Sequence, residues 1–120
     1  MEQNLYFAAE NGREEEVRKI LKENKEINVN WKNANADTAL HEACQNGHDK
    51  IVTMLLAHPD IDVNLKDDDG STPFLLACFH GTTTCARLLL KDARVKVNEP
   101  SKDGYTPLYW AAYNGHLEVI

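Results

Sequence analysis

The chain repeats itself with a period of 34 residues, with occasional steps of 35, and this periodicity constrains its fold more than any other property. The repeated columns are Thr38, Thr72 and Thr106; Gly12, Gly47, Gly81 and Gly115; Asn30, Asn64 and Asn98; and Ala8, Ala43, Ala77 and Ala111. A period of this length is typical of a solenoid, in which each unit stacks on the next. We therefore expect one repeat domain over residues 1–120, with units of roughly 1–30, 31–64, 65–98 and an incomplete 99–120.

Each unit is predicted to hold two short helices. A threonine precedes the first helix, where its hydroxyl can accept a hydrogen bond from a free backbone amide. In Thr72-Pro73 and Thr106-Pro107 a proline fills the first helical position, which needs no donor. A glycine then ends the helix, because it readily adopts the left-handed conformation. An apolar pattern after each glycine predicts the second helix, and the Asp- and Gly-rich segments between units predict projecting loops.

These motifs resemble the ankyrin repeat, in which T-P-L-H-x-A is followed by a G-H turn and a leucine-rich second helix. The matching segments are TALHEACQNG, TPFLLACFHG and TPLYWAAYNG, and the resemblance covers nearly the whole chain. It implies an all-α fold, an ankyrin-repeat solenoid of antiparallel helix pairs joined by projecting β-hairpin loops. It also implies an adaptor or scaffold that binds a protein partner through a concave groove and the hairpin tips, and that is not an enzyme.

The resemblance further implies which positions face the partner. In ankyrin repeats these are one face of the first helix and the loop tips. The helix positions here are Phe7, Glu10 and Asn11; Glu42, Gln45 and Asn46; Leu76, Phe79 and His80; and Trp110, Tyr113 and Asn114. The tip positions are Asn33, Asn35 and Asp37; Asp67, Asp69 and Ser71; and Lys102, Asp103 and Tyr105. The opposite helix face is small or apolar in every unit and is expected to be buried.

Four aromatic residues, Phe79, Tyr105, Trp110 and Tyr113, are expected to form one cluster in units three and four. Aromatic side chains of this kind are enriched at binding hot spots. In the alternative interpretation, Trp110 and Tyr113 pack against a following repeat, and scattered exposed aromatics are ordinary on protein surfaces. Both interpretations are open at this point.

Composition excludes several classes of function. The net charge is −6, with 19 acidic against 13 basic residues, whereas binding to nucleic acid or to an anionic membrane needs clustered Lys and Arg. No apolar run approaches the roughly 18 residues of a membrane-spanning helix, so we expect no membrane insertion. Three cysteines argue against a secreted disulfide framework, and we predict an intracellular, cytoplasmic location.

The histidines do not predict a metal site. His41, Cys44 and His48 have a spacing that could ligate zinc. However, Gly47 should end the helix before His48, so the three side chains would not share one face. The remaining histidines are interpreted as isolated, and they are His58, His80 and His116.

The cysteines do not predict a nucleophile either. Cys78 lies close to His80 in the sequence, but Cys44 and Cys78 share a column with alanines of units one and four. They should therefore be small buried hydrophobes, whereas a reactive thiol needs an accessible, electropositive setting. We expect no catalytic residue, no cofactor and no metal.

Three departures from the repeat pattern predict local consequences. Ala36 stands where the other two loops carry glycine, so its loop should be strained or differently shaped. Leu75 and Tyr109 replace the histidine that in the family forms hydrogen bonds between units. The β-branched run Thr82–Thr84 lowers helix propensity, so the second helix of unit three should be the least stable.

The fourth unit stops five residues after Gly115, midway through its predicted second helix. Apolar surface left exposed there predicts a longer repeat protein or pairing with something else. One form of such pairing is self-association through the uncapped C-terminal end, at Leu117, Val119 and Ile120. A different hypothesis is a regulatory or targeting segment of a larger enzyme or channel.

Overall fold

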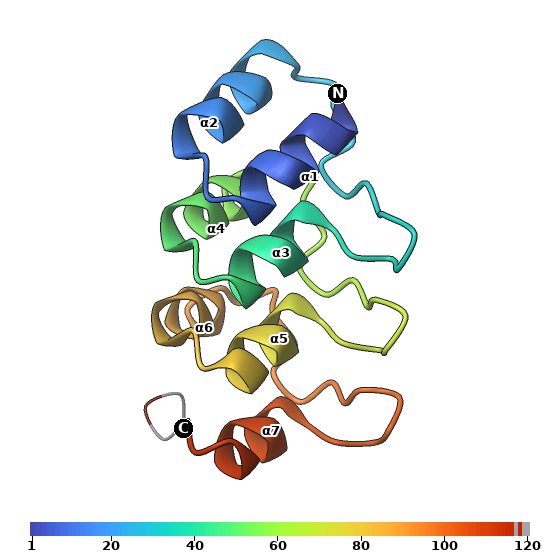
Figure 1. Ribbon diagram of the computed structural model, residues 1–120, viewed down its shortest axis with the longest axis vertical. Coiled ribbons are helices and arrows are strands. Elements are labelled where there is room, and N and C mark those ends of the chain that lie inside the picture. The colour runs from blue at the N-terminus through green and yellow to red at the C-terminus, as the bar shows by residue number, and fades with distance from the viewer. Residues whose placement is uncertain (117, 119–120) are drawn as a thin grey trace.

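The computed structural model describes residues 1–116 and 118, and over these residues the chain forms seven helices and no strand. The helices are α1 (Glu2–Glu10), α2 (Glu14–Glu23), α3 (Ala39–Gln45), α4 (Asp49–Leu56), α5 (Pro73–His80), α6 (Thr83–Leu90) and α7 (Pro107–Tyr113). They stack as antiparallel pairs into an elongated molecule of 41 × 25 × 25 Å (Figure 1). The helices α1, α3, α5 and α7 form one layer, and α2, α4 and α6 form the other. The predicted all-α solenoid is therefore confirmed.

The first helices of units two to four begin as the threonine column predicts. The hydroxyl oxygens of Thr38, Thr72 and Thr106 accept hydrogen bonds from the backbone amides three residues later, at 3.3, 3.1 and 3.2 Å. Pro73 and Pro107 occupy the first helical positions of α5 and α7. Each such cap contributes about 1 kcal/mol to stability.

The turns between paired helices depend on glycine for two reasons. The repeated glycines Gly12, Gly47, Gly81 and Gly115 have backbone φ angles between 70° and 76°. This left-handed region disfavours any residue with a Cβ atom. At Gly12 and Gly81 there is also no room, because a histidine of the next unit lies against the backbone. A Cβ atom on Gly12 would lie 2.7 Å from the ring of His48.

Those two histidines tie successive units together. His48 Nε2–H donates to the carbonyl oxygen of Glu10 at 3.0 Å, and His116 Nε2–H donates to that of Phe79 at 2.9 Å. The interpretation of His116 as isolated is therefore wrong, because it lies two periods after His48 and makes the equivalent bond. In unit three Thr82 takes this place, and its hydroxyl donates to the carbonyl oxygen of Cys44 at 2.6 Å.

A second set of hydrogen bonds between units is made by the repeated asparagines Asn30 and Asn64. Asn64 Nδ2 donates to the carbonyl oxygen of Arg94 at 2.9 Å, and Asn64 Oδ1 accepts from the amide of Lys96 at 2.8 Å. Asn30 makes the equivalent pair of bonds one unit earlier. Asn98 makes no such bond to any described residue. A side-chain amide thus matches one donor and one acceptor of the next unit's backbone.

The core lies between the two helix layers and between successive units. Its fully buried side chains include Leu5, Val17, Leu40, Ile51, Leu55 and Leu89. The helix face predicted to be buried is buried in units two and three, but in unit four the prediction is confirmed only for Ala111 and is wrong for the other two residues. There Leu108 is 59% exposed and Ala112 is exposed, because the described residues include no further helix pair to cover them.

The loops project from one side of the stack, next to the ends of α3, α5 and α7 (Figure 1). Each is closed by a turn, such as the one in which the Asp67 amide donates to the Ser71 carbonyl oxygen at 3.0 Å. Neighbouring loops share a backbone hydrogen bond, from the Asp68 amide to the Asn35 carbonyl oxygen at 3.0 Å, and the fourth unit's loop bonds to the third in the same way. They have the predicted hairpin shape without forming β-strands in the described part of the chain.

Candidate binding groove

A cavity of about 490 Å³ lies between the projecting loops and the first helices of units two to four. We call this cavity the groove. Its lining residues are Asp37, Gln45, Asp67, Asp69, Ser71, Leu75, Leu76, Phe79, His80, Ser101, Lys102, Asp103 and Trp110. The helices supply mainly the apolar part of the lining, and the loops supply the charged part.

The groove brings together most of the positions that the repeat pattern assigns to a partner. Those that line it are Asp37, Gln45, Asp67, Asp69, Ser71, Leu76, Phe79, His80, Lys102, Asp103 and Trp110. Two predicted contacts offer little surface, since Glu42 is 7% and Ser71 is 6% exposed. Burial raises the pKa of the Glu42 carboxyl. Glu42 and Ser71 therefore have almost no surface with which to contact a partner.

Two other predicted contacts hold neighbouring units together. Asn46 Nδ2 donates to the carbonyl oxygen of Glu10 at 3.3 Å, and Asn114 Nδ2 donates to that of Phe79 at 3.1 Å. These are the same two carbonyl oxygens that accept hydrogen bonds from His48 and His116. The asparagine side chains are therefore already engaged in joining the stack.

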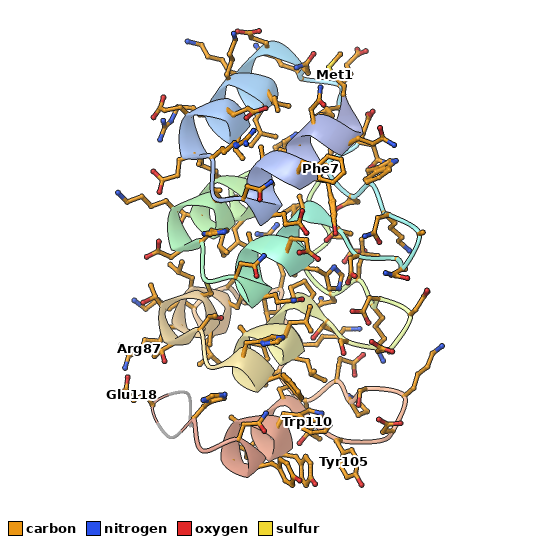
Figure 2. The ribbon with its side chains drawn as sticks, viewed as in Figure 1. Met1, Phe7, Arg87, Tyr105, Trp110 and Glu118 are labelled. Carbon is orange, nitrogen blue, oxygen red and sulfur yellow. The ribbon has the colours of Figure 1, made fainter. Side chains whose placement is uncertain are left out.

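An aromatic cluster lies at the unit-four end of the groove, and Figure 2 shows Trp110 and Tyr105 there. The Trp110 ring lies 4.9 Å from Phe79, 5.5 Å from Tyr105 and 5.9 Å from Tyr113, centroid to centroid, in edge-to-face geometry. Such pairs contribute about 0.5–1.5 kcal/mol beyond their buried area. Tyr113 is 70% exposed, whereas Trp110 and Phe79 are half-buried.

Tyr109 also belongs to this cluster, whereas the repeat pattern indicates only that it stands where the family has a histidine. Its ring stacks on Tyr105 at 4.3 Å and lies 5.3 Å from Trp110. In units two and three the same column holds His41 and Leu75, which are buried. Tyr109 is exposed because no described unit follows. The only indication in the sequence that Tyr109 joins the aromatic cluster is that it directly precedes Trp110.

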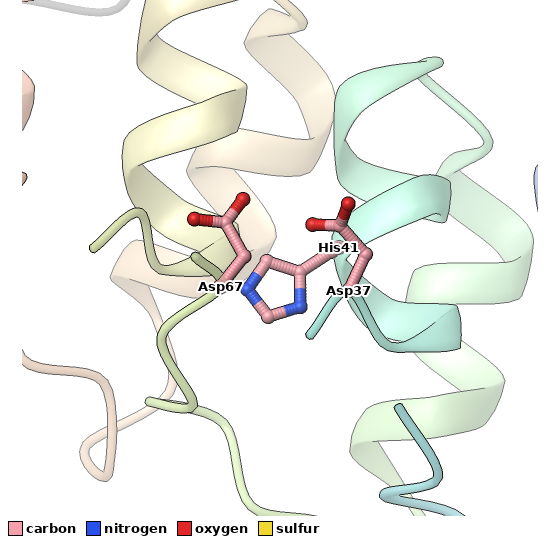
Figure 3. A group of neighbouring side chains, drawn as sticks. All are labelled: Asp37, His41 and Asp67. Atoms are coloured by element: carbon pink, nitrogen blue, oxygen red, sulfur yellow. The ribbon is translucent and has the colours of Figure 1, made fainter. Parts of the chain in front are cut away.

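The other end of the groove holds two carboxyl groups close together (Figure 3). Ligand atoms of Asp37, His41 and Asp67 all lie within 4.8 Å of one another. Asp67 Oδ1 accepts the backbone amides of Asp69 and Ser71, at 3.0 and 2.9 Å, so the loop holds this carboxylate in place. Burial and the adjacent, hydrogen-bonded Asp67 raise the pKa of Asp37 to about 7. Asp37 thus keeps its proton at mildly acidic pH.

His41 is a structural residue in this group. Its Nε2 lies 2.9 Å from the carbonyl oxygen of Ser71 in the next unit, which only accepts, so Nε2 carries the hydrogen. Its Nδ1 accepts the amide of Thr38 at 3.1 Å. Burial lowers the pKa of His41, which favours this neutral form. Both ring nitrogens are therefore engaged, and the two carboxyl groups alone are a poor ligand set for a metal.

The three cysteines are free thiols and buried. Burial raises the pKa of Cys78 to about 12 and that of Cys85 to about 11, so neither forms a thiolate at neutral pH. His80 instead packs against the Phe79 ring at 5.0 Å and lines the groove. The interpretation of Cys44 and Cys78 as small buried hydrophobes is confirmed.

No helix in the described part of the chain is both long enough and apolar enough to cross a membrane. A family model described as ankyrin repeats (3 copies) matches the chain over residues 2–67 and over residues 59–120. These matches span every residue that lines the groove.

Proposed function

Because the chain belongs to the ankyrin repeat family, we propose that it is an adaptor or scaffold that binds a protein partner in the groove. Repeats of this family are in general protein–protein interaction modules without catalytic activity. The proposed contacts are the apolar side chains Leu76, Phe79 and Trp110 together with the exposed loop tips. Tyr105 and Tyr113 extend this surface at the unit-four end.

The observation that supports the proposal most is the composition of the groove. Half-buried Phe79 and Trp110 form an apolar wall, and the acidic and polar loop residues surround it. Interfaces commonly combine a few aromatic anchors with a polar rim. A groove whose lining comes from three successive units suits an extended segment or a loop of another protein.

Two further points concern the cellular location of the chain and its assembly with other copies or domains. We propose an intracellular, cytoplasmic location, which three free, buried thiols support. Self-association was predicted through Leu117, Val119 and Ile120, which lie outside the described residues, and it stays a prediction. The hypothesis of a regulatory segment in a larger enzyme or channel likewise stays a prediction.

The test is a comparison of three baits in a pull-down from lysate of the source cells, read by mass spectrometry. The first is the native chain, and the second is a groove variant that combines Leu76→Ser with Tyr105→Ser. The third is a control variant, Lys50→Ser with Arg87→Ser. Lys50 and Arg87 are exposed on α4 and α6, which together with α2 form the layer of outer helices. Figure 2 shows Arg87 on the side away from Tyr105.

We expect the groove variant to lose a protein that both the native chain and the control variant retain. Circular dichroism must first show equal helicity for the three baits, so that loss of binding is not loss of fold. A partner that binds the groove variant normally and is lost from the control variant would contradict the proposal.

A further inference from the structure

We infer that the segment bound in the groove is basic, with a Lys or Arg side chain placed beside Asp37, Asp67 and Asp69 and an apolar side chain placed against Phe79 and Trp110. This inference rests on the proposed function and specifies the chemistry of the partner. It is drawn from the distribution of charge and aromatic surface along one cavity.

The first support is the charge of the groove. Its lining holds the aspartates Asp37, Asp67, Asp69 and Asp103 and one lysine, Lys102. None of the four aspartates takes part in an ion pair within residues 1–116 and 118. The ion pairs found there join Arg13 to Glu16, Arg18 to Glu15, Lys66 to Glu99 and Arg94 to Asp92. The negative charge of the groove is therefore left for a partner to neutralise.

The second support is that the acidic end is preorganised. The carboxylate of Asp67 is held by two backbone amides of its own loop, and Asp37 lies against it from the neighbouring loop. A guanidinium or ammonium group placed here would offer hydrogen-bond donors to both carboxyl groups and would replace the proton that Asp37 holds. The arrangement thus favours a cationic side chain over an acidic or neutral one.

The third support is the apolar end of the same cavity. Phe79 and Trp110 meet edge to face at 4.9 Å, and Leu76 lines the groove beside them. Fixed rings of this kind form a site for an aliphatic or aromatic side chain. Because both ends line one cavity, a short extended segment that carries a basic and an apolar residue can reach both.

The experiment uses random twelve-residue peptides displayed on phage, selected on the full chain. We expect the enriched peptides to carry Lys or Arg together with an aliphatic or aromatic residue. A synthetic copy of one enriched peptide is then titrated, by fluorescence anisotropy, into the native chain and two variants. The test variant combines Asp37→Asn with Asp69→Asn. The control is Asp68→Asn, which removes a charge from the same loop at an exposed position outside the groove lining.

We expect the test variant to bind the peptide at least about tenfold more weakly and the control within about twofold of the native chain. Binding to the native chain should also weaken as salt is raised. Asp69→Asn changes only the side chain and leaves the backbone of the loop as it is. Circular dichroism checks that both variants are folded.

The outcomes separate this inference from the proposed function. Enrichment of neutral or acidic peptides that bind the Asp37→Asn, Asp69→Asn variant normally, yet are lost from the Leu76→Ser, Tyr105→Ser variant, would overturn the basic partner and leave the groove as the binding site. Absence of any peptide enriched on the native chain over the groove variant would count against both.

Discussion

Among single residues, Ala36 occupies a left-handed backbone conformation, with φ of 63°. The same loop position in units three and four is Gly70 and Gly104, with φ of 77° and 85°. The three loops therefore share one geometry, and the alanine adopts it in spite of its Cβ atom. Of the two possibilities stated from the sequence, strain or a different shape, the structure supports strain.

Replacing this residue should stabilise the protein. We expect Ala36→Gly to raise the free energy of unfolding by about 0.5–1 kcal/mol, because relief of the left-handed strain exceeds the added entropy of the unfolded chain. The measurement is urea unfolding followed by circular dichroism. Ala34→Gly is the matched control, since Ala34 is exposed in the same loop without a positive φ. Equal effects of the two substitutions would show that Ala36 is not strained.

Asp37 gives a residue-scale prediction with a defined pH dependence. Its pKa is 3.8 in an unfolded chain and about 7 in the fold, so its favourable contribution to stability is present below pH 3.8 and is lost as the pH rises through 7. Asp37→Asn removes this loss. We expect the variant to match the native chain near pH 4 and to be more stable by about 1 kcal/mol at pH 8, a value discounted for partial exposure.

The measurement is the free energy of unfolding of both proteins from pH 4 to pH 8, taken as a difference. His41 contributes in the opposite sense, because its lowered pKa costs stability as the pH falls below 6.5, but this contribution cancels in the difference. Asp68→Asn serves as the control for loss of a charge. A stability difference that does not change with pH would contradict the assigned proton on Asp37.

At the scale of elements, the helix ends were predictable because each depends on residues within one unit. The threonine caps, the proline positions and the left-handed glycines all follow from local backbone chemistry. Contacts between units were harder to predict. The role of His116 shows only when it is compared with a residue two periods away.

The groove shows the same limit. Its helix positions could be assigned by repeat register, but the closeness of Asp37 and Asp67 could not. These residues belong to different columns and meet only because consecutive loops stack side by side. The buried state of Glu42 on α3 was also not predictable, because an acidic residue on the partner-facing side of a helix is usually solvated.

The asparagine column offers a test between equivalent positions. Asn64→Ala removes both side-chain hydrogen bonds to the next unit and leaves a backbone donor and acceptor to water, so we expect a loss of about 1–2 kcal/mol. Asn98→Ala, in the same column without such bonds among the described residues, should change stability by less than about 0.5 kcal/mol. Urea unfolding of both variants provides the comparison. Equal losses would mean that the bonds between units contribute little.

For the molecule as a whole, the stack should have unequal stability along its length. In a solenoid each unit is stabilised mainly by its neighbours. The helix α7 has a neighbour on one side in the described structure, and its Leu108, Tyr109 and Ala112 are exposed. By contrast, α3 and α5 are covered on both sides.

Amide hydrogen exchange tests this expectation. We expect amides of α7 to exchange fastest among the first helices and those of α3 slowest. Among the second helices, amides of α6 should exchange faster than those of α4, because α6 begins with the β-branched residue Thr83, which lowers helix propensity. The low stability of this helix remains a prediction. Uniform protection along the stack would indicate that the units unfold together.

We propose above all that a protein partner lies in the groove. The most direct test of this proposal is a chemical-shift map by nuclear magnetic resonance of the chain, with and without the partner recovered by pull-down. We expect shifts in the loops 33–37, 67–71 and 101–105 and on α5 and α7, and no shifts in the outer helices α2, α4 and α6. Shifts confined to α2, α4 and α6 would contradict it.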